Sequence, residues 1–593
     1  MSKMFKAVAQ GFHGPITVIS EIDNGKIKDI SAEGIQPDTV GTLSAKRMVE
    51  KIKEEKSVNI DAVTGATFSS SAVLKAAKKS MELAEGKITA AEANDLKQEP
   101  IDKVTVPTYA KVHTNRIYAS DVKFVDEYDV IIAGSGVAGL SAAIESARNG
   151  AKTVLFEKAG MIGGTSNFSH GIIQAAGTKQ QKEHTKYQKD DSQKHAREYL
   201  QAGEGHVDEE LVRDFTDDAA NTIAWLSEIG INWVDVYGHK SIPYENQKDF
   251  ADRIHVYDHG GHNGAGVIMT SKMLKAAKDA GVIIKYDSPV VGLVTKNLHN
   301  NEILGVVVNH HGQEKAYRAL KGTVLATASI DHNEQLAKEL SPWQYRDIKK
   351  NVLLTSKYDT GDGIILGMTN GAALTGIGGV MSADFKFGIG FSTQVITPPA
   401  FYINGLGKRY VNEDSTYGYL TRANYEQETS LGKPTWLVFG QNTVDEKNLP
   451  YETEEEIQKD ISRGRLIKAA TAEELAQKIE VSDQNLTDTL TIWNQNAKEK
   501  KDPAFGRRQG IEPLETPLYA YKNHDMNIGS IGGLKVNVNL QVIDNGHQPI
   551  EGLYAAGQNA GGIIGSYYAG SGTALGVGLH QGRKVGRQLA LKK

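Results

Sequence analysis

The 593-residue chain contains no cysteine. This absence excludes disulfide bonds, cysteine-ligated iron–sulfur clusters, c-type haem attachment and any cysteine nucleophile. The N-terminal stretch Met1–Ala7 lacks the apolar core of a signal peptide, and no later run approaches the ~20 apolar residues of a membrane helix. We therefore expect a cytoplasmic protein without a membrane span.

The chain also has little excess charge. Its 67 lysines and arginines are nearly balanced by 72 aspartates and glutamates, for a net charge of −5, which gives no reason to expect binding to nucleic acid. By contrast, glycine is frequent, with 61 residues. Many of these glycines stand in short loops beside apolar runs, as nucleotide-binding folds require. The length predicts several domains.

The stretch Asp61–Ser70 (DAVTGATFSS) precedes a helix that apolar spacing predicts over Ser71–Glu85. On local grounds Gly65 permits a turn, and Ser69 or Ser70 caps the helix. Upstream, alternating residues on either side of an Asn-Gly pair predict a β-hairpin.

The same stretch resembles the flavin-attachment motif of FMN-binding domains, in which a threonine hydroxyl is esterified to the FMN phosphate, and the hairpin matches the layout of those domains. The resemblance implies an α+β FMN-binding domain over residues 1–88, covalent FMN at Thr67 and a flavin transferase in the host. The polar segment that follows, with Pro100 and Pro107, predicts a linker over residues 89–127.

A second motif begins with the apolar strand Tyr128–Ala133. It continues with the glycine-rich turn Gly134–Gly139, a helix over Leu140–Asn149 and the strand Thr153–Phe156, and it ends at Glu157. This order within about thirty residues predicts a Rossmann unit that binds an adenine dinucleotide.

Each position in the turn has a defined task in such a unit. We expect Gly134 to allow the tight turn, Gly136 to let the pyrophosphate approach the backbone, and Gly139 to let the helix pack on the strand. Ala138 belongs to the same cofactor-contacting turn, and Glu157 is expected to bind the ribose hydroxyls. The pyrophosphate is then favoured by the helix N-terminus.

From Tyr128 to the C-terminus the chain resembles the fumarate reductase flavoprotein family. The resemblance rests on Lys158–Ser166 (KAGMIGGTS), Thr360–Gly363 and Gly552–Gln558, although Ala326–Ser329 departs from the usual Ala-Thr-Gly-Gly. It implies non-covalent FAD. The further FAD-binding residues that it implies are Lys158, Gly163, Gly164, Thr165, Ser166, Asp362, Gly557, Gln558, Ser571, Thr573 and Ala574.

The resemblance also implies an α/β fold in which the Rossmann-like FAD-binding domain is discontinuous. We expect its first part over residues 128–377 and its second over residues 527–593. An α+β capping domain over residues 378–526 would interrupt it and close over the substrate.

The positive side chains that bind dicarboxylates in this family are missing here. The family places its proton-donating arginine at the end of an Arg-Phe-x-Asn-Glu-x-x-x-Arg segment, where this chain has Tyr417, with Arg422 five residues later. A clamping histidine is replaced near Gly529, and the loop Gly565–Ala574 lacks the second clamping arginine. A carboxylate buried without such partners is disfavoured, so we expect a neutral substrate.

The same C-terminal loop resembles the Tyr-x-Gly-x-Gly segment of 3-ketosteroid dehydrogenases, where a tyrosine and a glycine amide polarise a carbonyl oxygen. The matching residues are Tyr568 and Gly572. Alternatively, Tyr567 and Tyr568 only pack against the flavin ring. His255, His259 and His262 fit no known metal-ligand spacing, and we expect no metal.

These motifs together predict an ene-reductase with two flavins. NADH or another reduced carrier would supply electrons through FMN to FAD for hydride transfer to a small neutral alkene conjugated to a phenol or ketone, as in bacterial vinylphenol reductases. The candidate catalytic residues are Tyr568, Gly572 and Tyr417. Three alternatives stay open: a fumarate-, urocanate- or cinnamate-type acid reductase that uses Arg422 or Arg409, a 3-ketosteroid dehydrogenase or reductase, and an electron-transfer flavoprotein.

Overall fold

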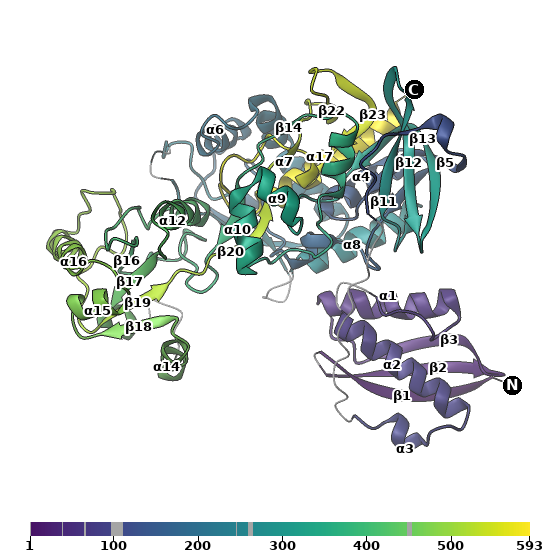
Figure 1. The fold of residues 1–593 in the computed structure, drawn as a ribbon, viewed down its shortest axis with the longest axis horizontal. Coiled ribbons are helices and arrows are strands. Elements are labelled where there is room, and N and C mark those ends of the chain that lie inside the picture. The colour runs from purple at the N-terminus through teal and green to yellow at the C-terminus, as the bar shows by residue number, and fades with distance from the viewer. Residues whose placement is uncertain are drawn as a thin grey trace.

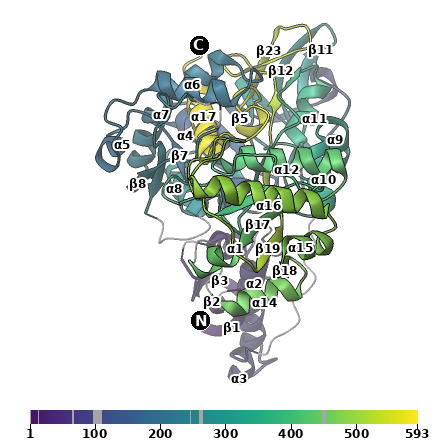
Figure 2. The ribbon, with the colours of Figure 1, turned by 90° about the vertical axis from the view of Figure 1, so that its left-hand side faces the viewer.

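The computed structural model describes residues 2–12, 14–37, 39–63, 67–96, 111–242, 244, 246–258, 265–446 and 453–592. A small N-terminal domain lies at the lower right of Figure 1, a large α/β domain occupies the centre, and a cap domain lies at the left. Figure 2 shows the cap from its outer side. The predicted fold class is confirmed. No helix among the described residues is long and apolar enough to cross a membrane.

The N-terminal domain is a three-stranded antiparallel sheet with helices packed on it. The turn between its second and third strands is the predicted Asn-Gly hairpin, with φ of 48° at Asn24 and 69° at Gly25, as a type I′ turn requires. Its last long helix begins at Thr67 rather than at the predicted Ser71. The elements are β1 (Lys3–Gly11), β2 (Gly14–Asp23), β3 (Lys26–Glu33), α1 (Val40–Glu55), α2 (Thr67–Ala84) and α3 (Ala90–Ala93).

The N-terminal domain contacts the central domain through α1. The Arg47 guanidinium lies 4.2 Å from the centre of the Tyr286 ring, and Glu50 forms a 3.1 Å ion pair with Lys278. The Tyr286 turn is adjacent to the end of the Rossmann unit, because Ser288 donates its backbone N–H to the Glu157 carbonyl at 2.8 Å. The interface therefore lies beside the predicted ribose-binding acid.

The central domain is organised around a nine-stranded sheet that contains the predicted strand–helix–strand unit. Three of its strands are parallel neighbours in the order β10-β6-β5, with α4 as the crossover helix. The strands are β4 (Ile117–Tyr118), β5 (Phe124–Ala133), β6 (Thr153–Phe156), β10 (Ile283–Lys285), β11 (Val290–Asn297), β12 (Asn300–His310), β13 (Gln313–Leu325), β22 (Gln541–Ile543) and β23 (Pro549–Ala555). β4 and the start of β5 fall within the range predicted as a linker.

The last helix returns from the C-terminal segment and packs closely on α4. A Cβ added at Gly582 would collide with the Ala138 carbonyl, and one added at Gly586 with the Ala142 carbonyl. This close approach fixes the loop that precedes the helix next to the glycine-rich turn. The larger helices are α4 (Val137–Arg148), α6 (Ser192–Ala202), α7 (Glu209–Glu228), α8 (Ala265–Asp279) and α17 (Thr573–Leu591).

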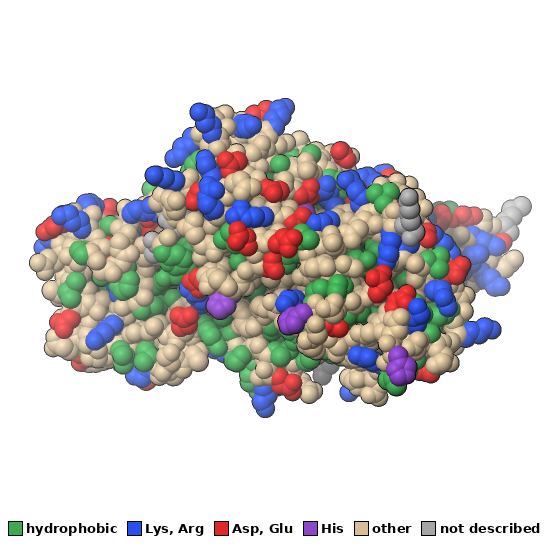
Figure 3. Space-filling view, turned by 90° about the horizontal axis from the view of Figure 1, so that it is seen from above, with side chains coloured by type: hydrophobic (Ala, Val, Ile, Leu, Met, Phe, Trp, Pro, Cys, Tyr) green, Lys and Arg blue, Asp and Glu red, His purple; other side chains and the backbone are tan. Residues whose placement is uncertain are grey.

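Shorter elements surround the central sheet. The short helices are α5 (Lys179–His184), α9 (Glu334–Leu340), α10 (Pro342–Lys350), α11 (Asp362–Thr369), η1 (Ala119–Asp121), η2 (Gly164–Phe168) and η3 (Gly557–Asn559). The short strands are β7 (Ile173–Gln174), β8 (Trp233–Tyr237), β9 (Ile254–Tyr257), β14 (Leu374–Thr375) and β21 (Gly533–Leu534). On the face seen in Figure 3, basic and acidic side chains are interspersed.

The cap is an antiparallel sheet in the order β16-β17-β19-β18, with an apolar cluster on each face. Two of its helices, α15 and α16, lie in the polar stretches Thr471–Ile479 and Asp483–Lys498. The elements are β16 (Ala400–Ile403), α12 (Tyr417–Leu431), β17 (Trp436–Gly440), α13 (Gln441–Asp445), α14 (Glu454–Ser462), β18 (Leu466–Ala469), α15 (Ala472–Lys478), α16 (Asp483–Lys498) and β19 (Leu518–Lys522).

The chain enters and leaves the cap along two paired strands, β15 (Val380–Ala383) and β20 (Met526–Ser530). A buried carboxyl stands next to each strand on the cap side. Burial raises the pKa of Asp384 to about 6 and that of Asp525 to about 8. At neutral pH Asp525 therefore retains its proton beside a second acid.

We predict that the stability of the α7–α17 contact depends on pH through His580. Its ring nitrogens lie 2.8 Å from an Asp214 oxygen and 2.9 Å from an Asp218 oxygen. Burial alone would lower the pKa of His580, but the two carboxylates raise it above 6.5. The stabilisation is present below pH 6.5 and is lost as pH rises through the higher folded-state pKa.

The free energy of unfolding of the holoenzyme should therefore fall between pH 6 and pH 9 through this group, by about 1.4 kcal/mol for each unit of pKa shift. Denaturant titrations of the wild type and of His580→Gln measure the difference. An equal pH slope in both proteins would contradict the assignment to His580.

Candidate active site

The glycine-rich turn has the shape that a dinucleotide requires. Gly134 has a φ of 96°, and a Cβ on it would collide with the Ala326 carbonyl. A Cβ on Gly139 would collide with the Gly134 carbonyl, whereas a Cβ on Gly136 would meet only Ser166 Oγ, at 3.4 Å. The fold therefore needs glycine at positions 134 and 139, whereas Gly136 faces open space at the N-terminus of α4.

Glu157 stands at the end of β6, where the Rossmann pattern places the ribose-binding acid. Its carboxylate accepts the Ser135 backbone N–H at 3.0 Å, the Ser135 hydroxyl, and the Ala159 backbone N–H at 2.7 Å. Burial raises its pKa against these hydrogen bonds. The side chain is fixed beside the glycine-rich turn, and its role toward ribose stays a prediction.

The other predicted FAD contacts gather at this turn. Ser166 Oγ accepts the Val137 backbone N–H at 3.2 Å, which joins the second predicted contact to the start of α4. The Lys158 ammonium lies 2.9 Å from Asp362 Oδ2. From the C-terminal part, Gly557 packs against Ala138. The predicted residues in contact with the turn are Glu157, Gly163, Ser166 and Gly557, while Gly164 and Thr165 lie in η2 and Gln558 follows Gly557 in η3.

Buried polar atoms around this cradle have no protein partner within the described part of the chain. They are Gln174 Oε1, Gln581 Nε2 and Asp331 Oδ2. Gln581 accepts the Gly557 backbone N–H through its other amide atom, at 2.8 Å, so the atom without a partner lies close to the cradle. Buried polar groups of this kind normally bind a ligand or an ordered water, and the residues present fit a polar cofactor such as FAD.

Tyr568 lies in the loop before α17 and is buried. Its hydroxyl accepts the Ala574 backbone N–H at 3.0 Å, which leaves its own proton available for donation. Burial raises the pKa of Tyr568 to about 12, so the hydroxyl stays protonated at physiological pH. Gly572, with a φ of 91°, packs against the backbone of Gln174, whose side-chain amide donates to the Ser571 carbonyl at 3.0 Å.

Tyr417 is the first residue of α12, and the fold brings it to this loop. The Ser571 hydroxyl donates to the Tyr417 hydroxyl at 3.0 Å. The rings of Tyr417 and Tyr568 have centroids 6.1 Å apart and are inclined by 60°. Phe391 stacks on the other side of Tyr417 at 4.5 Å. Two predicted catalytic tyrosines therefore share one site with Ser571.

The surroundings of this pair are apolar. Met381, Ile528, Ile531 and Ile564 pack in the same cluster. Burial raises the pKa of Tyr417, and the titratable groups that act next on it are Tyr568, Tyr237 and Tyr199. At the position of the family's clamping histidine, Gly529 has a φ of 143°, and an added Cβ would lie 2.6 Å from Gln558 Nε2. A side chain here would have to displace the ends of the Gln558 and Met381 side chains and adopt a strained backbone conformation.

The side chain of Arg422 contacts Glu204 and Tyr567 rather than the pair of Tyr417 and Tyr568. Its guanidinium forms hydrogen bonds with Glu204 at 2.5 and 3.0 Å and lies 4.4 Å from the centre of the Tyr567 ring. Thr573, predicted to contact FAD, shares a 2.6 Å hydrogen bond with Tyr199. Arg409 pairs with Glu413 and Asp502 inside the cap.

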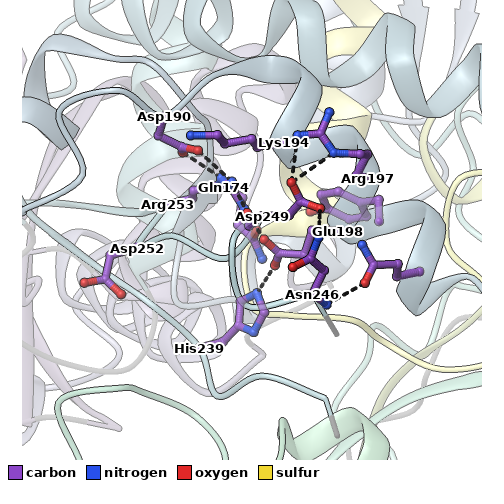
Figure 4. A network of polar contacts seen from close by, with 12 residues as sticks. Gln174, Asp190, Lys194, Arg197, Glu198, His239, Asn246, Asp249, Asp252 and Arg253 are labelled. Atoms are coloured by element: carbon purple, nitrogen blue, oxygen red, sulfur yellow. Dashed lines mark hydrogen bonds and ion pairs between the residues drawn. The ribbon is translucent and has the colours of Figure 1, made fainter. Parts of the chain in front are cut away.

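A buried ionic network that no sequence motif indicates lies next to the C-terminal loop Gly565–Ala574 (Figure 4). Glu198 accepts a 2.7 Å hydrogen bond from His239 and pairs with Arg253, which also binds Asp190 through two hydrogen bonds at 2.7 and 2.8 Å. A Cβ on Gly570 would lie 2.6 Å from the His239 ring, so the network supports the loop from behind. These residues belong to no contiguous motif.

Of the three histidines considered for a metal site, only His255 lies within the described residues. His255 lies 2.7 Å from the Thr178 hydroxyl and 2.9 Å from the Arg253 carbonyl, and burial lowers its pKa to about 4. His259 and His262 lie outside the described residues. Within the described ranges no group of three histidines, aspartates or glutamates is arranged to hold a metal.

A small pocket lies in the N-terminal domain at the start of α2. It is bordered by Phe12, Gln36, Thr39, Gly41 and Ser69, among others. Residues 64–66 and the Thr67 side chain lie outside the description, but the helix begins at Thr67, where N–H groups favour a phosphate. The pocket lies beside the predicted attachment site, and covalent FMN at Thr67 stays a prediction.

Comparisons with known proteins identify both flavin-binding domains. Residues 129–575 match the family model described as FAD binding domain, and residues 11–82 match the FMN-binding domain. Vinyl phenol reductase of Lactiplantibacillus plantarum is 26% identical over 504 residues, covering 78% of this chain and 97% of that protein. NADH:acrylate oxidoreductase of Vibrio harveyi is 26% identical over 614 residues, covering 94% of this chain and 58% of that protein.

Among solved structures, the 3-ketosteroid-Δ4-(5α)-dehydrogenase of Rhodococcus jostii, in complex with 4-androstene-3,17-dione, is similar with a TM-score of 0.68. It is 26% identical, and the match covers 81% of this chain and 100% of that chain.

Proposed function

Because the chain belongs to the FAD-binding-domain family and carries an FMN-binding domain in front of it, we propose that it is a two-flavin reductase of a neutral, activated carbon–carbon double bond. The substrate class is a small alkene conjugated to a phenol or ketone. The observation that carries this proposal is the packing of the Tyr417 ring against the Tyr568 ring in an apolar site, where the Ser571 hydroxyl donates to Tyr417.

The two tyrosines divide the work on such a substrate. When bound, FAD supplies the hydride and FMN the electrons that renew it. On an enone, Tyr568 donates a hydrogen bond to the carbonyl oxygen, together with the Gly572 backbone N–H, and thereby stabilises the negative charge that develops there; on a vinylphenol, the same groups hold the phenolic oxygen. Tyr417 delivers a proton to the second alkene carbon, and the Ser571 hydroxyl, which donates to it, stabilises the tyrosinate until a proton from water restores it.

The relatives support this class in two respects. The vinyl phenol reductase matches nearly over its whole length, and its name specifies a phenolic alkene. The NADH:acrylate oxidoreductase supports NADH as the electron source, and this chain spans 58% of it. It also supports the second candidate, an unsaturated-acid reductase, which would need a cation to hold the carboxylate.

An anaerobic screen tests the proposal. The reduced holoenzyme is mixed with fumarate, urocanate, a cinnamate, a vinylphenol and an enone, and flavin reoxidation is followed by absorbance. The vinylphenol or the enone should reoxidise the flavin fastest. A faster reaction with fumarate or urocanate would contradict the neutral-substrate proposal and favour the acid reductase.

We also propose that FMN is esterified to Thr67. Protein produced with a flavin transferase should keep flavin fluorescence on a denaturing gel, and Thr67→Ala should lose all of it, because no ester can form. Thr64→Ala, in the same motif, is the matched control and should keep its fluorescence. Protein produced without the transferase defines the background, and fluorescence retained in Thr67→Ala would refute the attachment site.

A further inference from the structure

Arg422 belongs to a polar cluster of four side chains. Its guanidinium donates two hydrogen bonds to Glu204 and lies over the Tyr567 ring at 4.4 Å. The Tyr244 hydroxyl donates to Glu204 and lies 2.9 Å from the Tyr567 hydroxyl. We call Arg422, Glu204, Tyr244 and Tyr567 the Arg422 clamp.

The clamp connects parts of the chain that are far apart in sequence. Glu204 follows α6, Tyr244 lies between β8 and β9, and Tyr567 lies in the loop before α17. Arg422 lies in α12, the helix between the cap and the central domain in Figure 1, and that helix begins with Tyr417. The clamp therefore joins the helix that carries one proposed catalytic tyrosine to the loop that carries the other.

Tyr567 and Tyr568 are consecutive residues whose rings pack in different clusters. Tyr567 packs with Tyr419 at 5.9 Å, and Tyr568 packs with Tyr417 at 6.1 Å. Because both pairs join the same helix to the same loop, a shift of the Tyr567 ring displaces the Tyr568 backbone. The position of the Tyr568 hydroxyl thus depends on the contacts that the Tyr567 ring makes on the other side of the loop.

The two opposite charges in the clamp, on Glu204 and Arg422, are partly shielded from water and form an ion pair. Partial burial would raise the pKa of Glu204, but hydrogen bonds from Arg422 and Tyr244 lower it. Burial would lower the pKa of Arg422, but its ion pair with Glu204 raises it. The raised pKa keeps the Arg422 guanidinium protonated, and both of its terminal nitrogens donate to Glu204. Such a group is suited to holding a loop in place rather than to releasing a proton.

We propose that Arg422 is a positioning residue, which with Glu204 and Tyr567 holds the loop so that Tyr568 meets Tyr417 at the geometry that the reaction needs. This inference rests on the proposed function, in which the tyrosine pair acts on the substrate.

Glu204→Gln tests the clamp, because it keeps the shape of the side chain and removes the charge. Turnover of the best alkene should fall roughly 10- to 100-fold, the size of effect that a small misplacement of a catalytic group produces, with little change in KM. Arg422→Gln should cause a similar loss, and the double variant should lose no more than either single variant. Glu209→Gln, in the exposed pair with Arg213, is the matched control and should not change turnover.

Two further variants separate positioning from proton donation. Exchanging the charges, with Glu204→Arg and Arg422→Glu together, should recover part of the activity that each single exchange loses. Arg422→Lys keeps a charge and loses the two-pronged geometry, so it should fall between the wild type and Arg422→Gln. Wild-type turnover in Glu204→Gln combined with loss of turnover in Arg422→Gln would overturn the clamp and make Arg422 a proton donor or substrate contact.

Hydrogen–deuterium exchange of the holoenzyme gives a readout that needs no substrate. Backbone amides of residues 565–574 should exchange faster in Glu204→Gln than in the wild type, and should be unchanged in Glu209→Gln. Unchanged exchange in Glu204→Gln would overturn the clamp even if no alkene of the proposed class were reduced. Faster exchange with unchanged turnover would overturn its part in the reaction.

Discussion

Replacing Gly136 by valine is expected to abolish FAD binding in a protein that still folds. The backbone at Gly136 has a φ of −62° and a ψ of 179°, which any residue adopts, and an added Cβ would meet only Ser166 Oγ, at 3.4 Å. The branched side chain instead fills the space at the N-terminus of α4 through which a pyrophosphate must approach. Released FAD should fall to background, whereas circular dichroism should match the wild type.

A second glycine provides the contrast. Gly139→Ala adds only one carbon, but that carbon would collide with the Gly134 carbonyl inside the fold. We expect this variant to lose stability, by roughly 1–3 kcal/mol as in other overpacked sites, in addition to any loss of FAD. Normal FAD content in folded Gly136→Val protein would show that the cofactor is bound elsewhere.

The dinucleotide site could be predicted from the sequence because its parts are contiguous. The strand, turn, helix and terminal acid between Tyr128 and Glu157 are set by short-range backbone geometry, and β5, α4 and β6 occur where they were expected. Their boundaries differ slightly from the prediction, since β5 begins at Phe124 rather than at Tyr128 and α4 begins earlier than expected. Because Gly136 is the N-cap, α4 begins at Val137 rather than at the predicted Leu140.

The proposed catalytic contacts could not be predicted from local motifs, because they join residues that are far apart in the sequence. Tyr417 and Ser571 are 154 positions apart, and their hydrogen bond exists only because α12 and the C-terminal loop meet. Family resemblance selected Tyr417 and Tyr568 as single positions, but it could not show that Arg422 is paired with a residue 218 positions away. No sequence pattern indicated the network of His239, Glu198 and Arg253, because each is an ordinary polar residue until the fold buries it.

Tyr568→Phe and Tyr417→Phe are each expected to lower turnover of the best neutral alkene by ~10²–10³-fold while FAD stays bound, the usual cost of losing an oxyanion partner or a proton donor. Both substitutions keep the rings that pack against each other and remove only the hydroxyls. Because Tyr568 has a pKa of about 12, its loss should not change the pH profile below pH 10.

The two substitutions are expected to affect KM and turnover differently. In Tyr417→Phe the substrate oxygen is still held by Tyr568, so KM should change little while the proton-dependent step slows. In Tyr568→Phe the oxygen loses its partner, and both binding and turnover should weaken. Tyr519→Phe removes a hydroxyl that binds Gln441 inside the cap and serves as the control, with activity retained. If Tyr568→Phe kept full turnover, or if the wild type reduced fumarate fast, the tyrosine pair would not carry the reaction, and a cation such as Arg422 would have to enter the site.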